Sequence, residues 1–267
     1  MKCFIVLAGL VYILLSSATL PAQAGTTEAR VRASQKLLVC IWPDYYGITY
    51  RNPKTLQLTG IDIDLAHEFA HDLGSGVKPV FVDSSFSRLI ADISNGSCDV
   101  AMFAIGITAA RAEKLRFTKP TLRSDIYAIT TKSNRRIKEW ADIDRNGIVV
   151  AVAKGTYHEP VMREKLKKAS LLVADTPFAR EQEVESGRAD LFMTDYPYSQ
   201  RMLATTDWAR LLSSPTPYHL TSYAYAVKPG DAKWHARVER FVEDIKRDGR
   251  LMTAARRHKL ETIVISE

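Results

Sequence analysis

Strand-like and helical segments alternate along most of the chain, and this order limits the folds open to it. Apolar or β-branched runs predict strands at Lys36–Ile41, Val77–Val82, Cys98–Phe103, Ile148–Ala153, Ser170–Val173 and Ala189–Met193. Apolar residues at helical spacing predict helices at Asp62–Leu73, Ser87–Ser94, His158–Lys168, Ala179–Ser186 and Tyr196–Ala204. Strands joined by helices run parallel with both faces covered, so we expect an α/β fold with mostly parallel, helix-covered sheets.

The alternation falls into two units, which predicts two lobes. The units span residues 36–122 and 133–217, and strand-like crossings join them at Leu122–Lys132 and Tyr218–Lys228. We expect residues 25–123 with 225–267 to form lobe 1 and residues 124–224 to form lobe 2. The C-terminal helices expected at Ala232–Lys246 and Arg250–His258 then return to lobe 1. Ligands of open α/β sheets bind at the carboxyl ends of strands, so facing lobes define a cleft.

The first 24 residues have the pattern of an export signal. Lys2 precedes an apolar run from Phe4 to Leu15, and the segment ends in the small residues Ala22 and Ala24. The apolar run is too short to span a bilayer, and the ending suits signal peptidase, so we expect cleavage before residue 25. A retained N-terminal anchor is the alternative.

Composition and charge exclude several classes of protein. The 267 residues are 46% hydrophobic and 25% charged, which is typical of a globular chain and excludes disorder. The net charge of +7 becomes +6 when the signal, with its one lysine, is removed. Basic residues are dispersed among acids and apolar residues, so we expect solvated helix faces and no nucleic-acid partner.

Two cysteines stay in the exported chain, and we expect them not to pair. Cys40 lies late in one expected strand, and Cys98 opens another. In neighbouring parallel strands this offset exceeds the Cα separation of about 7 Å that a disulfide can bridge.

One motif points to a metalloenzyme, but helix geometry argues against that interpretation. The segment from His67 to His71 fits H-E-x-x-H, with Glu68 as the general base. Two residues along a helix correspond to about 200°, so both histidines lie opposite the apolar stripe that includes Phe69. We expect a solvated helix face and no metal site, with a zinc peptidase as the remote alternative.

Four motifs in register resemble a known family. They are Gly106-Ile107-Thr108-Ala109-Ala110-Arg111 with Phe117-Thr118-Lys119-Pro120, Gly60-Ile61-Asp62-Ile63-Asp64-Leu65, Ala153-Lys154-Gly155-Thr156, and Gly187-Arg188-Ala189-Asp190-Leu191 with Thr194-Asp195. Over residues 36–258 the pattern resembles bacterial family 3 extracellular solute-binding proteins. The resemblance implies a two-lobed periplasmic-binding fold and capture of an amino acid or similar carboxylate for an inner-membrane ABC permease. It also implies a periplasmic location, a monomeric receptor and no cofactor.

The matched motifs carry the expected ligand contacts. Arg111 can hold a carboxylate through a bidentate fork, and Thr108 can cap the turn and add a hydroxyl. The N–H groups of Gly155 and Thr156 open a helix and suit the same carboxylate. Asp195 ends another strand and can take the α-ammonium of an amino acid.

Three residues after lobe 1 strands complete the expected pocket. Asp44, Tyr45 and Phe86 stand where the family places its side-chain selector and aromatic wall. The neighbouring residues 103–105 are apolar, so the expected ligand is an aromatic or hydrophobic amino acid, or a carboxylate that lacks an amine.

A second interpretation is enzymatic, because the chain also resembles periplasmic cyclohexadienyl dehydratases of the same fold. The shared segments are Pro43-Asp44-Tyr45-Tyr46, Leu166-Lys167-Lys168-Ala169 and residues 188–195. Loss of hydroxide from prephenate or arogenate requires a general acid. The dehydratase pattern places a Glu where this chain has Tyr198, and a phenol with a pKa of about 10 is a poor donor. His158 and Glu159 are the nearby substitutes, and a catalytically degenerate relative is a further alternative.

Overall fold

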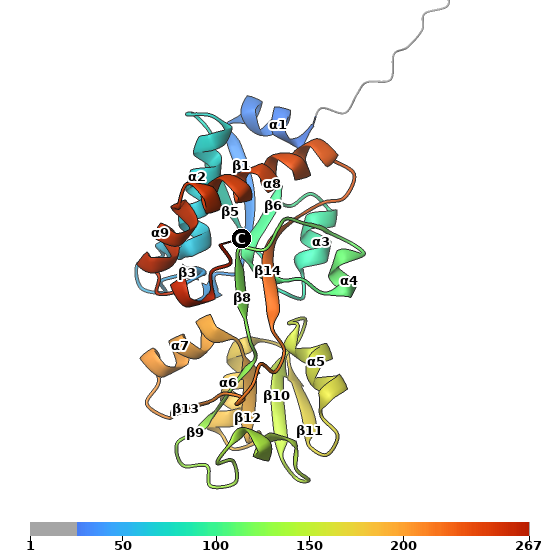
Figure 1. Cartoon of the computed structure of the whole chain (residues 1–267), viewed down its shortest axis with the longest axis vertical. Helices are drawn as coiled ribbons and strands as arrows, with labels where there is room; N and C mark the ends of the chain where they lie inside the picture. The colour runs from blue at the N-terminus through green and yellow to red at the C-terminus, as the bar shows by residue number, and fades with distance from the viewer. Residues whose placement is uncertain (1–25, 267) are drawn as a thin grey trace, which may run out of the picture.

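Two sheets, one in each lobe, form the framework of the computed structural model, which describes residues 26–266 (Figure 1). The strands are β1 Lys36–Ile41, β2 Asp44–Tyr45, β3 Thr49–Arg51, β4 Leu58–Thr59, β5 Lys78–Asp83, β6 Val100–Gly106, β7 Arg116–Phe117, β8 Leu122–Ser124, β9 Tyr127–Thr131, β10 Val149–Ala153, β11 Ser170–Ala174, β12 Leu191–Thr194, β13 Ala209–Leu212 and β14 Thr221–Val227. The helices are α1 Thr27–Ser34, α2 Ile61–Leu73, α3 Leu89–Ser94, α4 Ala109–Ala112, α5 His158–Lys165, α6 Pro177–Glu185, α7 Tyr196–Thr205, α8 Ala232–Arg247 and α9 Arg250–Arg257, with 3₁₀ turns η1 Trp140–Asp144 and η2 Glu261–Ile263.

The sheet of the first lobe has the strand order β5-β1-β6-β14-β7, with β8 also paired to β14. Strands β5, β1 and β6 are parallel, and β14 runs antiparallel to β6, β7 and β8. Five strands therefore point one way and β14 points the other. Every residue of β6 is buried, as a strand covered on both faces requires.

The second sheet repeats this plan with the order β11-β10-β12-β9-β13. Here β9 is the reversed strand, antiparallel to β12 and β13. The chain passes between the sheets after β8 and again before β14, which run between the lobes in Figure 1. The expected two-lobed α/β fold with mostly parallel sheets is confirmed. The lobe boundaries at residues 124 and 225 stay a prediction.

The expected elements are all present, with ends shifted by at most three residues. The C-terminal helices return to the first lobe as predicted, because α8 packs on α1 and α9 packs on α2. The chain then ends beside β8, where Val264 bridges Leu122. The short hairpin strands β2, β3 and β4 were not expected. They follow β1 and place Tyr45 at the cleft.

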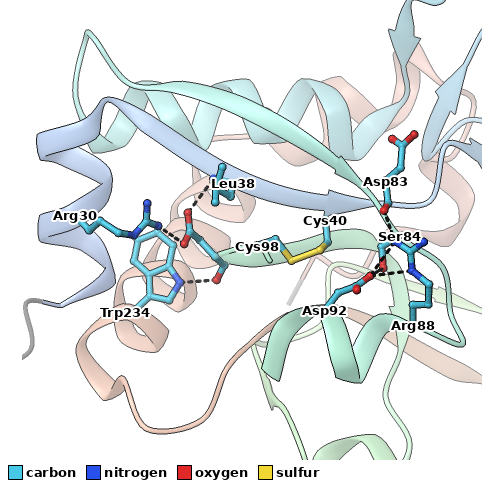
Figure 2. Close-up of a disulfide and its surroundings, with 10 residues drawn as sticks. Arg30, Leu38, Cys40, Asp83, Ser84, Arg88, Asp92, Cys98 and Trp234 are labelled. Atoms are coloured by element: carbon cyan, nitrogen blue, oxygen red, sulfur yellow. Dashed lines mark hydrogen bonds and ion pairs between the residues drawn. A yellow bond between two sulfur atoms is a disulfide. The ribbon is translucent and has the colours of Figure 1, made fainter. Parts of the chain in front are cut away.

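The expectation that the two cysteines do not pair is wrong. Cys40 and Cys98 form a disulfide with a Cα separation of 5.5 Å (Figure 2). The offset between the strands does not separate the cysteines, because β6 begins only at Val100 and Cys98 lies in the irregular segment before it. There the Asp99 carboxylate accepts from the Leu38 N–H at 2.8 Å, so the approach to β6 folds against β1 instead of extending the strand.

The histidines of the H-E-x-x-H motif are exposed on α2, as predicted, whereas Leu65 and Phe69 are buried. Glu68 lies 3.4 Å from Arg250. The predicted export signal falls outside the described residues. Within residues 26–266, no helix combines the length and the apolar character that crossing a bilayer requires.

Removing the disulfide should destabilise the fold. The bridge closes a loop of 58 residues, and for a loop of this length the loss of the cross-link costs about 2–4 kcal/mol of unfolding free energy. Urea unfolding of the Cys40→Ala, Cys98→Ala variant is the measurement, with the reduced wild-type protein as its control. Equal unfolding free energies for the oxidised protein and the variant would contradict this prediction.

Candidate functional site

The two lobes face each other across a cleft that narrows to a small internal cavity. The cavity has a volume of about 20 Å³, room for roughly one water molecule. Its lining comes from both lobes and consists of Trp42, Tyr45, Phe86, Ala104, Thr156, Tyr157, His158, Pro177, Arg180, Thr194, Asp195 and Tyr198. A wider groove of about 530 Å³ lies beside it and shares Trp42, Phe86, Thr156, Pro177 and Tyr198. The strand ends therefore meet where the fold predicts a ligand site.

Asp195 is the buried acid of the cavity. It ends β12 and caps α7, where its carboxylate accepts from the Tyr198 N–H at 3.2 Å. The same carboxylate accepts hydrogen bonds from the Tyr45 hydroxyl and, at 2.9 Å, from the Tyr223 hydroxyl. Burial raises the pKa of Asp195, and the two phenols oppose that rise. Three donors from the chain itself thus surround the group predicted to take an ammonium.

Arg111 is the buried cation of the first lobe, on α4. Its Nη1 donates to the Gly106 carbonyl at 2.8 Å, and its Nη2 donates to the Gly155 carbonyl at 3.0 Å. The guanidinium carbon lies 5.6 Å from the centroid of the Phe86 ring. Burial lowers the pKa of Arg111 to about 10, so the side chain is still charged at neutral pH. Arg111 therefore brings a positive charge to the cleft and links the two lobes.

Gly155 makes the close approach of the lobes possible. Its backbone has φ +76°, and a Cβ there would lie 2.7 Å from the backbone of Ser87 in the other lobe. The Gly155 N–H donates to the Glu159 carboxylate at 3.1 Å. The neighbouring Thr156 hydroxyl donates to the Ala153 carbonyl at 2.7 Å. In this arrangement Gly155 offers its carbonyl to Arg111, while its N–H, predicted to meet the ligand, already has a partner.

The structure brings six of the predicted residues together around the cavity, namely Tyr45, Phe86, Thr156, His158, Asp195 and Tyr198. Arg111 adjoins them through Phe86. Asp44 is exposed and lines the wider groove instead. Thr108 caps α4 by accepting from the Arg111 N–H at 3.3 Å. Glu159 pairs with Arg163 at 2.9 Å, away from the cavity lining.

Sequence reasoning missed several cavity residues, of which Arg180 is the most informative. It lies on α6 and is only 2% exposed. Its Nη1 donates to the Met193 carbonyl at 2.7 Å, and its guanidinium packs over the rings of Phe192 and Tyr198. An arginine four residues before the buried Val184, on the apolar face of a helix, was the available signal. Trp42, Tyr157 and Tyr223 gave no comparable signal.

Both the ring and the hydroxyl of Tyr198 are fixed by contacts with neighbouring side chains. Its ring stacks on Trp42 with centroids 6.0 Å apart, and its hydroxyl donates to the buried Glu181. Glu181 also pairs with Arg201 at 3.1 Å. Burial raises the pKa of Tyr198 well above its ordinary value. The phenol is therefore a weaker acid here than in water.

His158, the first residue of α5, lines the cavity as a neutral ring. Burial is the main cause that holds its pKa well below the ordinary value, and the positive charge of Arg180 acts in the same direction. At neutral pH the imidazole therefore offers one N–H donor and one acceptor nitrogen.

Asp62 fixes the backbone of Ala104, one of the residues that line the cavity. Ala104 lies in β6 with φ +47°, a left-handed conformation that costs free energy for a residue other than glycine. The buried Asp62 carboxylate accepts from the Ala104 N–H at 3.0 Å and from the Tyr225 hydroxyl at 2.9 Å. These bonds hold the kink that turns Ala104 into the cavity, and burial raises the pKa of Asp62 to about 6.

The raised pKa of Asp62 predicts a pH-dependent stability. The folded protein holds the Asp62 proton up to about pH 6, whereas the unfolded chain releases it near pH 4. The unfolding free energy should therefore fall by about 3 kcal/mol from this group as pH rises from 4 to 6. For Asp62→Asn, the unfolding free energy measured by urea titration between pH 4 and 7 should not show this decrease. Asp207→Asn, at an exposed site, is the control, and parallel slopes for wild type and Asp62→Asn would refute the assignment.

Comparison with known proteins agrees with this architecture. The family model described as bacterial extracellular solute-binding proteins, family 3, matches residues 37–260. The chain is 34% identical over 183 residues to the cyclohexadienyl dehydratase of Pseudomonas aeruginosa, covering 68% of this chain and 67% of that protein. It is 26% identical over 230 residues to the glutamine-binding protein GlnH of Bacillus subtilis, covering 84% and 81%.

A solved structure shares both the fold and part of the sequence. It is that of the ancestral amino-acid-binding protein AncCDT-1, described as a precursor of cyclohexadienyl dehydratase. The TM-score is 0.78 at 27% identity, and the match covers 87% of this chain and 99% of that one.

Proposed function

The chain belongs to family 3 of the bacterial extracellular solute-binding proteins, and from this premise we propose that it is a periplasmic receptor for a small carboxylate or amino acid. The ligand binds in the cleft between the lobes, and the loaded protein delivers it to an inner-membrane ABC permease. A cleaved export signal, the lobe boundaries given above and a monomeric state are parts of the same proposal. The relatives with binding functions, such as GlnH, support it.

The observation that carries this proposal is the buried charge of Arg111 at the lobe interface. A buried guanidinium is costly unless its donors are paired. Two of its donors reach the carbonyls of Gly106 and Gly155, one from each lobe. A ligand carboxylate can replace these carbonyls with a charge-assisted fork. The rings of Phe86 and Trp42 then cover the apolar part of the ligand.

Arg111→Lys should weaken the binding of carboxylate ligands by about 1.5–3 kcal/mol, because an ammonium cannot make the bidentate contact. Isothermal titration of protein refolded without ligand measures the change in Kd. Arg116→Lys, an exposed arginine on the same lobe, is the matched control. An unchanged Kd for Arg111→Lys would exclude Arg111 from the site.

A second candidate function is dehydration of prephenate or arogenate. The 34% identity to the Pseudomonas aeruginosa dehydratase favours it. The three proton donors available from the sequence argue against efficient catalysis. Tyr198 is a weakened acid, His158 is neutral, and Glu159 is engaged with Gly155 and Arg163. The geometry therefore favours binding over turnover.

Tyr198→Glu should bring a general acid into the cavity. The new carboxyl would take the buried position of Tyr198, where burial favours its protonated form and the neighbouring cations Arg180 and Arg201 act in the opposite direction. General acid catalysis contributes about 10²–10⁴-fold, so the variant should gain measurable prephenate dehydration while the wild type shows little. Tyr198→Gln, which cannot donate an acidic proton, is the control.

Native mass spectrometry of the refolded protein with amino acids, oxo acids and prephenate separates the two functions. A receptor keeps its ligand unchanged, whereas a dehydratase returns phenylpyruvate. Wild-type turnover of about 1–10³ per second on prephenate or arogenate would replace the receptor proposal with the enzymatic one.

A further inference from the structure

Three buried nitrogen atoms at the cavity lack hydrogen-bond partners. They are both ring nitrogens of His158 and Nε of Arg180, and within residues 26–266 no other buried side-chain nitrogen or oxygen shares this property. His158 is 5% exposed and Arg180 is 2% exposed, and both side chains line the cavity. A buried polar atom without a partner costs free energy, so native proteins seldom keep such atoms without a role.

The neighbouring acid does not satisfy these nitrogens. The Asp195 carboxylate is occupied by the hydroxyls of Tyr45 and Tyr223 and by the Tyr198 N–H. Glu181 is occupied by Tyr198 and Arg201. Neither carboxylate is therefore free to accept from these nitrogens, and the ammonium of an amino acid would have to displace a tyrosine from Asp195.

The residues around the cavity carry an excess of positive charge. The lining cation Arg180 and the adjoining cation Arg111 face the single lining anion Asp195, because His158 is neutral and Glu181 pairs with Arg201. A ligand with one carboxylate brings the net charge of the site to zero, whereas a zwitterionic ligand leaves an excess positive charge. Complementary charge is what selects among ligands of similar shape.

We propose that His158 and Arg180 form a second subsite that binds an uncharged oxygen of the ligand, so that the ligand is a 2-oxo or 2-hydroxy acid and not an amino acid. This inference rests on the proposed binding function. Arg111 binds the carboxylate, and the Nε of Arg180 and one N–H of His158 donate to the second oxygen. The cavity is small, so that oxygen lies on the carbon next to the carboxylate.

A series of four acids that differ at one atom position tests the subsite. The probes are 4-methyl-2-oxopentanoate, 2-hydroxy-4-methylpentanoate, 4-methylpentanoate and L-leucine, each titrated into refolded wild-type protein. We expect the oxo or the hydroxy acid to bind at least about tenfold more tightly than 4-methylpentanoate and L-leucine, as the loss of hydrogen bonds to a charged donor predicts. The two oxygen-bearing acids distinguish a ketone from a hydroxyl ligand.

His158→Phe is the decisive variant, because the two ring nitrogens that it removes make no hydrogen bond of normal geometry. The variant should be more resistant to urea than the wild type, since it removes two unpaired buried nitrogens. It should also lose about 3–10-fold in affinity for the preferred oxygen-bearing acid and nothing for 4-methylpentanoate. Opposite changes in stability and affinity are not expected of a residue that only packs.

His219→Phe is the matched control, since His219 lies beside Tyr157 but outside the cavity lining. Equal affinity for all four acids, tighter binding of L-leucine, or an unchanged preference in His158→Phe would overturn the subsite and leave the receptor proposal intact. Failure of these four acids and of every amino acid and oxo acid in the mass-spectrometry panel to bind would overturn both.

Discussion

The carboxylate of Asp195 lies at the junction of the two lobes, and its burial constrains the groups around it. A buried charge must be surrounded by donors, or it costs several kcal/mol. The chain provides them from three places, through Tyr45 after β1, Tyr223 in β14 and the first turn of α7. Tyr45 belongs to the first lobe and Tyr223 to a strand of the first sheet, so the solvation of one acid joins the lobes.

The same requirement applies to Arg111 with the opposite charge. Its guanidinium takes carbonyl partners from Gly106 and Gly155, and the glycine at 155 is needed because a side chain would collide with Ser87. The contacts that Arg111 and Asp195 make across the cleft are thus made by groups able to meet a ligand. Binding exchanges internal partners for ligand atoms, and only the difference between the two appears as affinity.

The aromatic and polar parts of the cavity have separate roles. Stacked rings such as Trp42 and Tyr198 exclude water and strengthen the electrostatic interactions between the buried groups. Burial also weakens Tyr198 as an acid and keeps His158 neutral. A cleft with these properties is suited to holding an anion and poorly suited to supplying a proton.

Local pattern in the sequence determined the strands, the helices and their alternation, because the apolar periodicity of each element is contained within it. The resemblance to family motifs predicted Arg111, Tyr45, Phe86 and Asp195 as ligand contacts, and these residues lie at or beside the cavity. Tertiary structure alone decided the rest. The irregular entry to β6 joined Cys98 to Cys40, the packing of α6 buried Arg180, and the turn at Gly155 drew Glu159 away from the cavity. The disulfide and the burial of Arg180 depend on contacts between separate segments of the chain, and no local pattern encodes such distances.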